Sequence, residues 1–88
     1  MRRLAGSKQF ERDCKKHLKY LISVAWVEVL YILLNDTQLP VKYNDHPLTG
    51  DWKDHRDCHI KPDLVLIYKK QDNDLILVRL GTHSELGL

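Results

Sequence analysis

Six polar residues, of which the last four are Gln71–Asp74, separate two apolar runs in the C-terminal part of the chain, Leu64–Tyr68 and Leu75–Leu80. Continuous apolar runs of this length are typical of strands in the middle of a sheet, and Asp and Asn favour the turn between them. The segment therefore predicts a β-hairpin. Arg79 is the only charge within the second run. We expect its side chain either to extend to the edge of the sheet or to hold an anionic ligand.

A third strand is expected directly before the hairpin, over Trp52–Ile60, and Lys61 with Pro62 ends it. Because side chains alternate between the two faces of a strand, this segment predicts one face rich in apolar residues and one that is wholly polar. The first face carries Trp52, Asp54, Arg56, Cys58 and Ile60, and the second carries Lys53, His55, Asp57 and His59. Cys58 is expected to be a buried, unreactive thiol.

The N-terminal half predicts two helices. Ser7 can serve as an N-cap, and the apolar residues that follow recur at helical spacing: Phe10, Cys14, Leu18 and Leu21. A second helix is expected over Ser23–Asn35, which is apolar almost all round. Such a helix is either buried on two sides or leaves part of its surface for a partner, and we favour the partner.

These elements predict an α+β fold in which two N-terminal helices pack on a three- to four-stranded antiparallel sheet, the fourth strand coming from residues 1–6. A chain of 88 residues is expected to form one domain, residues 1–88. The apolar run 21–34 contains Glu28 and is shorter than a membrane span. Since the two cysteines form no paired motif, we expect a cytoplasmic protein with no membrane contact.

The charge of the chain is unevenly distributed. The first nineteen residues carry only two acidic side chains, Glu11 and Asp13, against seven basic ones: Arg2, Arg3, Lys8, Arg12, Lys15, Lys16 and Lys19. This local charge of +5 can attract a polyanion, although a solvated helix face is an equal alternative. His17, in the same segment, is expected only to be solvated.

Four of the five histidines fall in the C-terminal half, and the carboxylates between them include Asp57 and Asp63. The histidines are His46, His55, His59 and His83. Imidazoles and carboxylates brought together suit proton transfer near neutral pH. Cleavage of RNA needs a base for the 2′-hydroxyl, an acid for the leaving 5′-oxygen and a cation for the phosphorane charge, and this set supplies all three without a metal or cofactor.

Alternatives remain for single members of this set. Asp57 and His59, with His46 or His83, could bind zinc, but no zinc-binding motif supports this. His55 is expected to be a surface residue. Asp57 could equally be an ion-pair partner of Arg56 or Lys53, or a member of the site.

The residue order DHPLTGDWKDHRDCHIKPDLVLIY…VRLGTHSEL resembles bacterial toxins of the RelE/ParE superfamily, and within it the YafQ-type messenger RNA interferases. The resemblance is close over the C-terminal half and extends to the helix–helix layout of the rest. It implies a compact fold of two helices against an antiparallel sheet and ribosome-dependent cleavage of translated messenger RNA, which inhibits translation. It also implies neutralisation by a cognate antitoxin protein.

The resemblance also implies where the activity lies. The family's active residues match His46, His59, Asp63 and His83, and positions in or beside the site match Asp57 and Arg79. On this basis we predict His83 as the general acid, His46 or Asp63 as the base, and His59 with Arg79 stabilising the phosphate. Lys53 and Arg56 are expected to contact the substrate. Lys15, Lys16 and Lys19 are expected to contact ribosomal RNA.

Two further points bear on function. Chains of this type commonly carry an aromatic residue shortly after the last histidine, whereas here the tail is Glu85–Leu88, so base stacking at that point is weakened or absent. The alternative from a different class is a ParE-like toxin that binds and poisons DNA gyrase without cutting RNA. A pure gyrase binder has no chemical need for His46, His59 and His83, so the histidines favour the nuclease.

Overall fold

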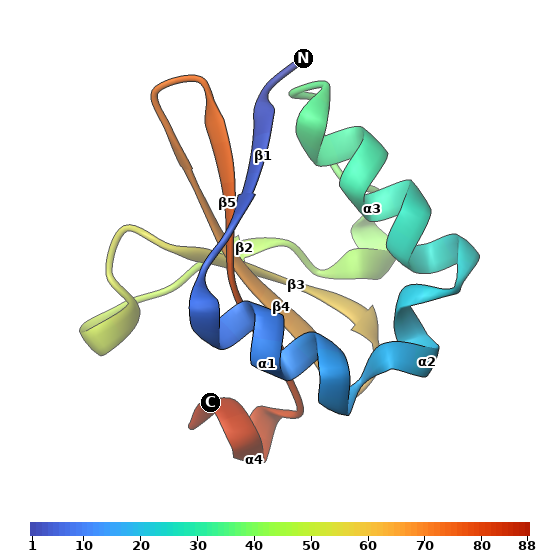
Figure 1. Ribbon diagram of the computed structural model, residues 1–88. Coiled ribbons are helices and arrows are strands. Elements are labelled where there is room, and N and C mark those ends of the chain that lie inside the picture. Colours follow the sequence, from blue (N-terminus) through green and yellow to red (C-terminus); the bar gives the residue numbers. More distant parts are fainter.

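The computed structural model describes residues 1–88 as a five-stranded sheet in the order β1-β5-β4-β3-β2 (Figure 1). Its strands are β1 (Arg3–Gly6), β2 (His46–Pro47), β3 (Arg56–Lys61), β4 (Leu64–Gln71) and β5 (Asp74–Gly81). The helices are α1 (Lys8–Lys16), α2 (Leu18–Leu21), α3 (Val24–Leu34) and α4 (His83–Leu86), with short 3₁₀ turns at Val41–Tyr43 and Gly50–Trp52. The expected α+β class is confirmed.

The sheet differs from the prediction in strand number and direction. Strands β2 to β5 form an antiparallel meander, but β1 lies parallel to β5, so the sheet is mixed and has five strands rather than three or four. No tight turn joins β1 to β5, and the helices intervene between them in the chain, so local sequence does not fix their relative direction.

The third predicted strand begins four residues later than expected. Gly50–Trp52 forms a 3₁₀ turn, and Asp54 has a φ of 71°, in the left-handed region that interrupts an extended strand. From Arg56 onwards the predicted alternation is confirmed: Cys58 and Ile60 enter the main core, and Asp57 lies on the opposite face with His59.

Both predicted helix starts are confirmed by their caps. The Ser7 hydroxyl accepts a hydrogen bond from the Phe10 backbone N–H at 2.9 Å, and Ser23 does the same for Trp26 at 3.2 Å. The first helix is not continuous, however. It breaks at His17, whose φ of −115° and ψ of 28° are not helical, and this break separates α1 from α2.

The two faces of the sheet are covered differently. The main core lies between the sheet and the N-terminal helices, and it includes Phe10, Trp26, Val29, Leu33, Cys58, Leu66, Tyr68, Leu75, Leu77 and Leu80. A smaller cluster lies on the other face, where Val65 and Ile67 pack against Leu86 of α4. Burial of Leu86 against the sheet fixes α4, which begins at His83, to this second face.

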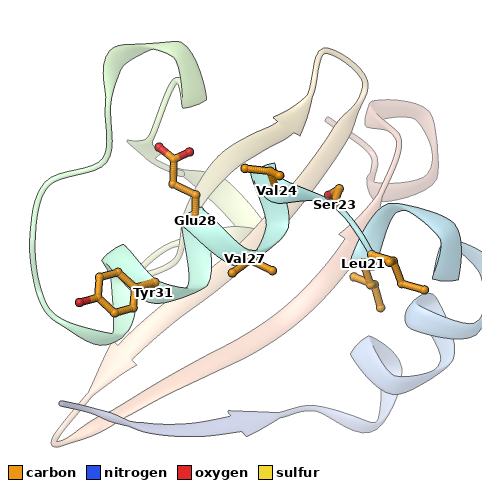
Figure 2. Close-up of a pocket in the computed structure, with 7 residues that line it drawn as sticks. Leu21, Ser23, Val24, Val27, Glu28 and Tyr31 are labelled. Atoms are coloured by element: carbon orange, nitrogen blue, oxygen red, sulfur yellow. The ribbon is translucent and has the colours of Figure 1, made fainter.

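Helix α3 is buried on one side only. Trp26, Val29 and Leu33 face the core, whereas Val24, Val27 and Tyr31 are 82%, 63% and 65% exposed. Figure 2 shows these exposed side chains along the face of α3 that is turned away from the sheet. Burial on two sides is therefore wrong, and an apolar surface remains open. None of the helices combines the length and apolar character needed to cross a bilayer.

Candidate active site

Three histidines from separate elements meet on the second face of the sheet. His46 comes from β2, His59 from β3 and His83 from the first turn of α4. The ring centroids of His46 and His59 are 6.3 Å apart, and those of His59 and His83 are 5.1 Å apart, with both pairs edge to face. The sheet register explains this, because His46 lies opposite Asp57, while His59 lies in one row with Val65 and Gly81, two residues before His83.

The His46 ring contacts two acceptors. Its Nδ1 lies 2.8 Å from the Asn44 carbonyl oxygen, which can only accept, so Nδ1 carries a proton. Its Nε2 lies 3.0 Å from Asp57 Oδ1, but the two are not aligned for a hydrogen bond, and Oδ1 has no other donor. An unprotonated Nε2 would place a lone pair against a carboxylate oxygen. A proton on either His46 or Asp57 is therefore needed to stabilise this contact.

Asp57 is the buried carboxyl of the site, with 3% of its side chain exposed. Burial raises the pKa of Asp57, and the positive charges that His46, His59 and His83 can carry lower it in part. Neither Arg56 nor Lys53 pairs with Asp57, so the ion-pair alternative is not formed. A buried carboxyl without an aligned donor is an uncommon feature that favours proton exchange with the ring beside it.

Asp63 orients His83. One oxygen, Oδ1, accepts from the His83 backbone N–H at 3.0 Å and from the ring Nδ1 at 2.7 Å. These two bonds hold the pKa of Asp63 below its usual value. Since Nδ1 donates to Asp63, the other ring nitrogen, Nε2, remains free to give or take a proton.

His59 lies between the other two rings and makes no hydrogen bond of its own. Partial burial lowers the pKa of His59. Asp57 opposes this effect, and His83 and His46 add to it. A ring whose neutral form is favoured can accept a proton or a hydrogen bond at neutral pH without first losing its own proton.

The helix that carries His83 is anchored by Glu85. Thr82 and Glu85 form a capping box, in which the Thr82 hydroxyl accepts from the Glu85 N–H and the Glu85 carboxylate accepts from the Thr82 N–H. The same carboxylate pairs with Lys16 and lies 2.9 Å from His17 Nε2. Hydrogen bonds from Lys16, the Thr82 backbone and His17 lower the pKa of Glu85 to about 2.

The contacts of Glu85 with Lys16, His17 and Thr82, here called the Glu85 anchor, correct one prediction and account for the small residue at position 81. His17 was expected to be solvated, but only 12% of its side chain is exposed and it binds Glu85, so that prediction is wrong. A Cβ at Gly81 would approach Glu85 Oε1 to 2.9 Å, so a larger residue there would shift the Glu85 carboxylate from this position. The anchor therefore ties α4 to the junction of α1 and α2.

Arg79 is held by a buried carboxylate. Its Nε lies 2.9 Å and its Nη2 3.4 Å from the two oxygens of Asp13, and Asp13 also accepts from the Leu80 backbone N–H. Burial of Asp13 raises its pKa, but the donors outweigh this and the net shift is downwards. Arg79 lies opposite Ile67 of β4, which in turn lies opposite Asp57 of β3. Arg79 and Asp57 are therefore two strands apart, at roughly 10 Å. Nη1 takes no part in these bonds.

Arg56 lies on the opposite face from Asp57. Its guanidinium pairs with Asp45 at 3.2 Å, and Asp45 also accepts from the Tyr68 hydroxyl at 2.5 Å. Burial raises the pKa of Tyr68, and the bond to Asp45 adds to this effect. Arg56 is thus not brought into the histidine cluster. Its ion pair fixes Asp45, the residue before His46.

The remaining predicted residues lie outside the cluster. Lys53 is exposed, and its side chain makes no hydrogen bond or ion pair, while its carbonyl accepts from His55 Nδ1. His55 packs against Trp52 with ring centroids 5.5 Å apart. On the N-terminal helices, Lys15 is exposed without an ion-pair partner, Lys16 is paired with Glu85, and Lys19 lies over the Tyr20 ring.

Sequence reasoning missed three carboxylates that hold residues in or near the site: Asp13, Asp45 and Glu85. The spacing Thr82-x-x-Glu85 is a capping-box signal that could have been found beforehand. No comparable local signal exists for Asp13 or Asp45, because their partners are distant in the chain. The structure contains no group of three or more His, Cys, Asp or Glu side chains arranged to hold a metal ion.

Oriented imidazoles beside a buried carboxyl can exchange protons with a phosphodiester substrate. Comparison with known proteins shows the family to which the chain belongs. Residues 2–87 match the family model described as "Bacterial toxin of type II toxin-antitoxin system, YafQ". The mRNA interferase toxin YafQ of Escherichia coli K12 is 46% identical over 76 residues, which cover 85% of this chain and 73% of the relative.

Solved structures of bacterial toxins also resemble this chain in sequence and fold. A metal-bound toxin from Helicobacter pylori is 44% identical, with a TM-score of 0.87 over 98% of this chain and 99% of that one. The toxin in the E. coli DinJ–YafQ complex is 39% identical, with a TM-score of 0.83 over 98% of each chain. Fold and sequence together define a bacterial toxin of a type II toxin–antitoxin system. Within that class, the chain belongs to the YafQ family.

Proposed function

We propose that this toxin is a ribosome-dependent endoribonuclease that cleaves translated messenger RNA by metal-independent acid–base catalysis and thereby inhibits translation. The observation that carries the proposal is the convergence of His46, His59 and His83 on one face of the sheet, each held differently. The relative from E. coli K12 is an mRNA interferase. The family assignment lends no support to the gyrase-poison alternative.

The geometry suggests a division of roles. His83, oriented through Nδ1 by Asp63, would protonate the leaving 5′-oxygen through Nε2. Because Asp63 is committed to His83, His46 is the better base. With the proton of this contact on Asp57, Nε2 of His46, 3.0 Å away, has a free lone pair and would take the proton of the 2′-hydroxyl. His59, between the two, would contact the phosphate.

Arg79 has a smaller role in this scheme than the sequence predicted. Asp13 binds the Nε–H and one Nη2–H of Arg79, so only Nη1 and the second Nη2–H could donate to a substrate oxygen. Lys15, Lys16 and Lys19 lie along α1 and α2, where they would contact ribosomal RNA through phosphates without reading its sequence. Such contacts would weaken as the salt concentration rises.

The direct test is primer-extension mapping of a messenger translated by purified ribosomes in the presence of the toxin. Wild type should produce cuts on ribosome-bound but not on free messenger, and His83→Ala should abolish them. His55→Ala is the matched control, because His55 lies outside the cluster and should cut normally. Cuts by His83→Ala, or intact messenger with inhibited gyrase, would overturn the proposal.

We further propose that a cognate antitoxin forms a hetero-oligomer with this chain and covers the exposed apolar face of α3. The E. coli structure is of a DinJ–YafQ complex, and the fold matches over nearly the whole chain. Val24, Val27 and Tyr31 leave an apolar surface open in the free toxin (Figure 2). Val27→Glu should weaken antitoxin binding, whereas Leu4→Glu, at an exposed apolar residue of β1, should not. Equal antitoxin binding by both variants would exclude this face of α3 as the antitoxin-binding surface.

A further inference from the structure

A hollow of about 460 Å³ lies beside the histidine cluster, between the N-terminal helices and the turn that joins β3 to β4. The helices contribute basic and aromatic side chains to it, and the turn and the start of α4 contribute the rest. Its lining includes Lys16, His17, Lys19, Tyr20, Lys61 and Thr82. Asp63, which orients His83, also lines it, so the hollow adjoins the site without being part of it.

The hollow carries unbalanced positive charge. Lys16 is paired with Glu85, and the carboxylate of Asp63 is bound to His83. Lys19 and Lys61 have no carboxylate within ion-pair distance, and both are exposed. Two unpaired ammonium groups at the rim of a hollow favour a phosphate.

Tyr20 gives the hollow an aromatic surface. The ring is partly exposed, with the Lys19 ammonium 5.0 Å from its centroid and the His17 ring 6.3 Å away. An aromatic side chain next to a cation is the combination with which proteins bind single-stranded nucleic acid, because every base has a face that can stack.

Lys61 connects this hollow to the catalytic rings. It also lines a second hollow, of about 300 Å³, together with His59. A strand of RNA whose scissile phosphate lies at His59 would therefore pass Lys61 before reaching Tyr20.

We propose that this hollow binds the nucleotide next to the scissile phosphate. Lys19 and Lys61 hold its phosphate, so Lys19 contacts messenger rather than ribosomal RNA, and the base stacks on Tyr20 in place of the Lys19 ammonium. This rests on the proposed nuclease function. It also supplies from α2 the aromatic contact that the C-terminal tail, Glu85–Leu88, lacks. Tyr20 is then a specificity-determining residue, because bases differ in how strongly they stack.

The test is a titration of the isolated toxin with a trinucleotide RNA that carries 2′-O-methyl groups and so cannot be cut. Amide chemical shifts measured by NMR report binding at Tyr20 and Thr82. Tyr20→Leu should bind at least about fivefold more weakly. Lys19→Ala and Lys61→Ala should each reduce the slope of log K against log salt by about 0.7. Lys8→Ala, at an exposed lysine of α1 outside the hollow, is the control and should behave as wild type.

Tyr20 also packs against the main core, so its variant could fail by unfolding. Tyr20→Phe keeps the ring and should restore binding, and the amide spectrum of each variant reports its fold. If folded Tyr20→Leu, Lys19→Ala and Lys61→Ala all bind the trinucleotide as wild type does, the inference is overturned. Binding of inorganic phosphate without any effect of Tyr20→Leu on the trinucleotide would overturn the base contact. A preference for an acidic peptide over RNA would also overturn it.

Failure of this inference is distinguishable from failure of the proposed function. His83→Ala should bind the trinucleotide normally but cut nothing. A wild-type toxin that binds at Tyr20 without cutting translated messenger would refute the nuclease and leave the nucleotide site. A toxin that cuts, and whose Tyr20 and Lys61 variants bind and cut equally well, would refute the site alone.

Discussion

Two pairs of adjacent residues, Asp45–His46 where β2 begins and Arg56–Asp57 of β3, build polar networks on opposite faces of one sheet. The networks differ in how completely their hydrogen bonds are satisfied. On the core face, Asp45 accepts from both Arg56 and Tyr68. On the other face, the next residue along each strand forms the His46–Asp57 pair, in which the buried Oδ1 has no aligned donor. The same kinds of side chain are thus used for stability on one face and left available for chemistry on the other.

The two networks differ in whether a proton can move between their members. In the Asp45 network the Arg56 Nε–H, one Arg56 Nη2–H and the Tyr68 hydroxyl all donate to the Asp45 carboxylate, and moving a proton would break the network. In the His46–Asp57 contact, burial favours a neutral Asp57 while the adjacent ring favours its charged form. Two such groups can exchange a proton at little cost, which a general base requires. Satisfied polar groups stabilise a fold, and the unsatisfied one marks the candidate site.

The largest effect is expected from Asp57→Asn, which keeps the shape of the side chain but removes its ability to take a proton. Cleavage of ribosome-bound messenger should fall by about 10²- to 10⁴-fold under single-turnover conditions. The variant should be at least as stable as wild type at pH 7, because burying a charged carboxylate is unfavourable. Asp36→Asn, at an exposed carboxylate, is the control. Full activity of Asp57→Asn would remove Asp57 from the mechanism.

Asp45→Ala should lower the stability of the protein but change its cleavage activity little. It leaves the buried Tyr68 hydroxyl without its acceptor, so the free energy of unfolding should fall by about 1–3 kcal/mol. Because Asp45 precedes His46 and makes no contact with the rings, cleavage per folded molecule should change by less than about tenfold. Urea unfolding and single-turnover cleavage measure the two effects. A cleavage loss as large as that of Asp57→Asn, without loss of stability, would contradict the assignment of the Asp45 network to stability rather than catalysis.

Glu85→Gln should change how stability depends on pH. The pKa of Glu85 is lowered from 4.5 to about 2 in the folded protein, so its ionised form stabilises the fold above about pH 4.5. That stabilisation is lost as the pH falls through the folded-state value. Wild type should therefore be more stable than Glu85→Gln at pH 6, and the difference should shrink towards pH 2. Urea unfolding at several pH values checks this. A difference independent of pH would contradict the anchor's dependence on charge.

The smallest effect is expected from metal removal. If acid–base chemistry by the histidine face is sufficient, EDTA should leave the cleavage rate within about twofold of its untreated value. The assay should compare EDTA with its magnesium complex at equal concentration, since ribosomes themselves need magnesium. The metal-bound relative from H. pylori makes the comparison worthwhile. Loss of cleavage that added zinc or copper restores would contradict a metal-independent mechanism.

Several features were predictable from local sequence. The hairpin of β4 and β5, the caps Ser7 and Ser23, and the alternation from Arg56 to Ile60 all follow from spacing within one turn or strand. The burial of Cys58 follows from the same alternation. The concentration of histidines in the C-terminal half is also visible in the sequence, and the family resemblance selected His46, His59 and His83 among them.

Tertiary structure alone decided which groups became partners. Arg79 and Asp13 are 66 residues apart, and Asp63 and His83 are 20 apart, so no periodicity relates them. Arg56 and Asp57 are adjacent in sequence, yet the pleat sends them to opposite faces and to different partners. The parallel direction of β1 is likewise a long-range outcome. Local sequence fixes which face a side chain takes, because the periods of helix and strand are short. Only the folding of distant segments onto one sheet decides what lies beside it.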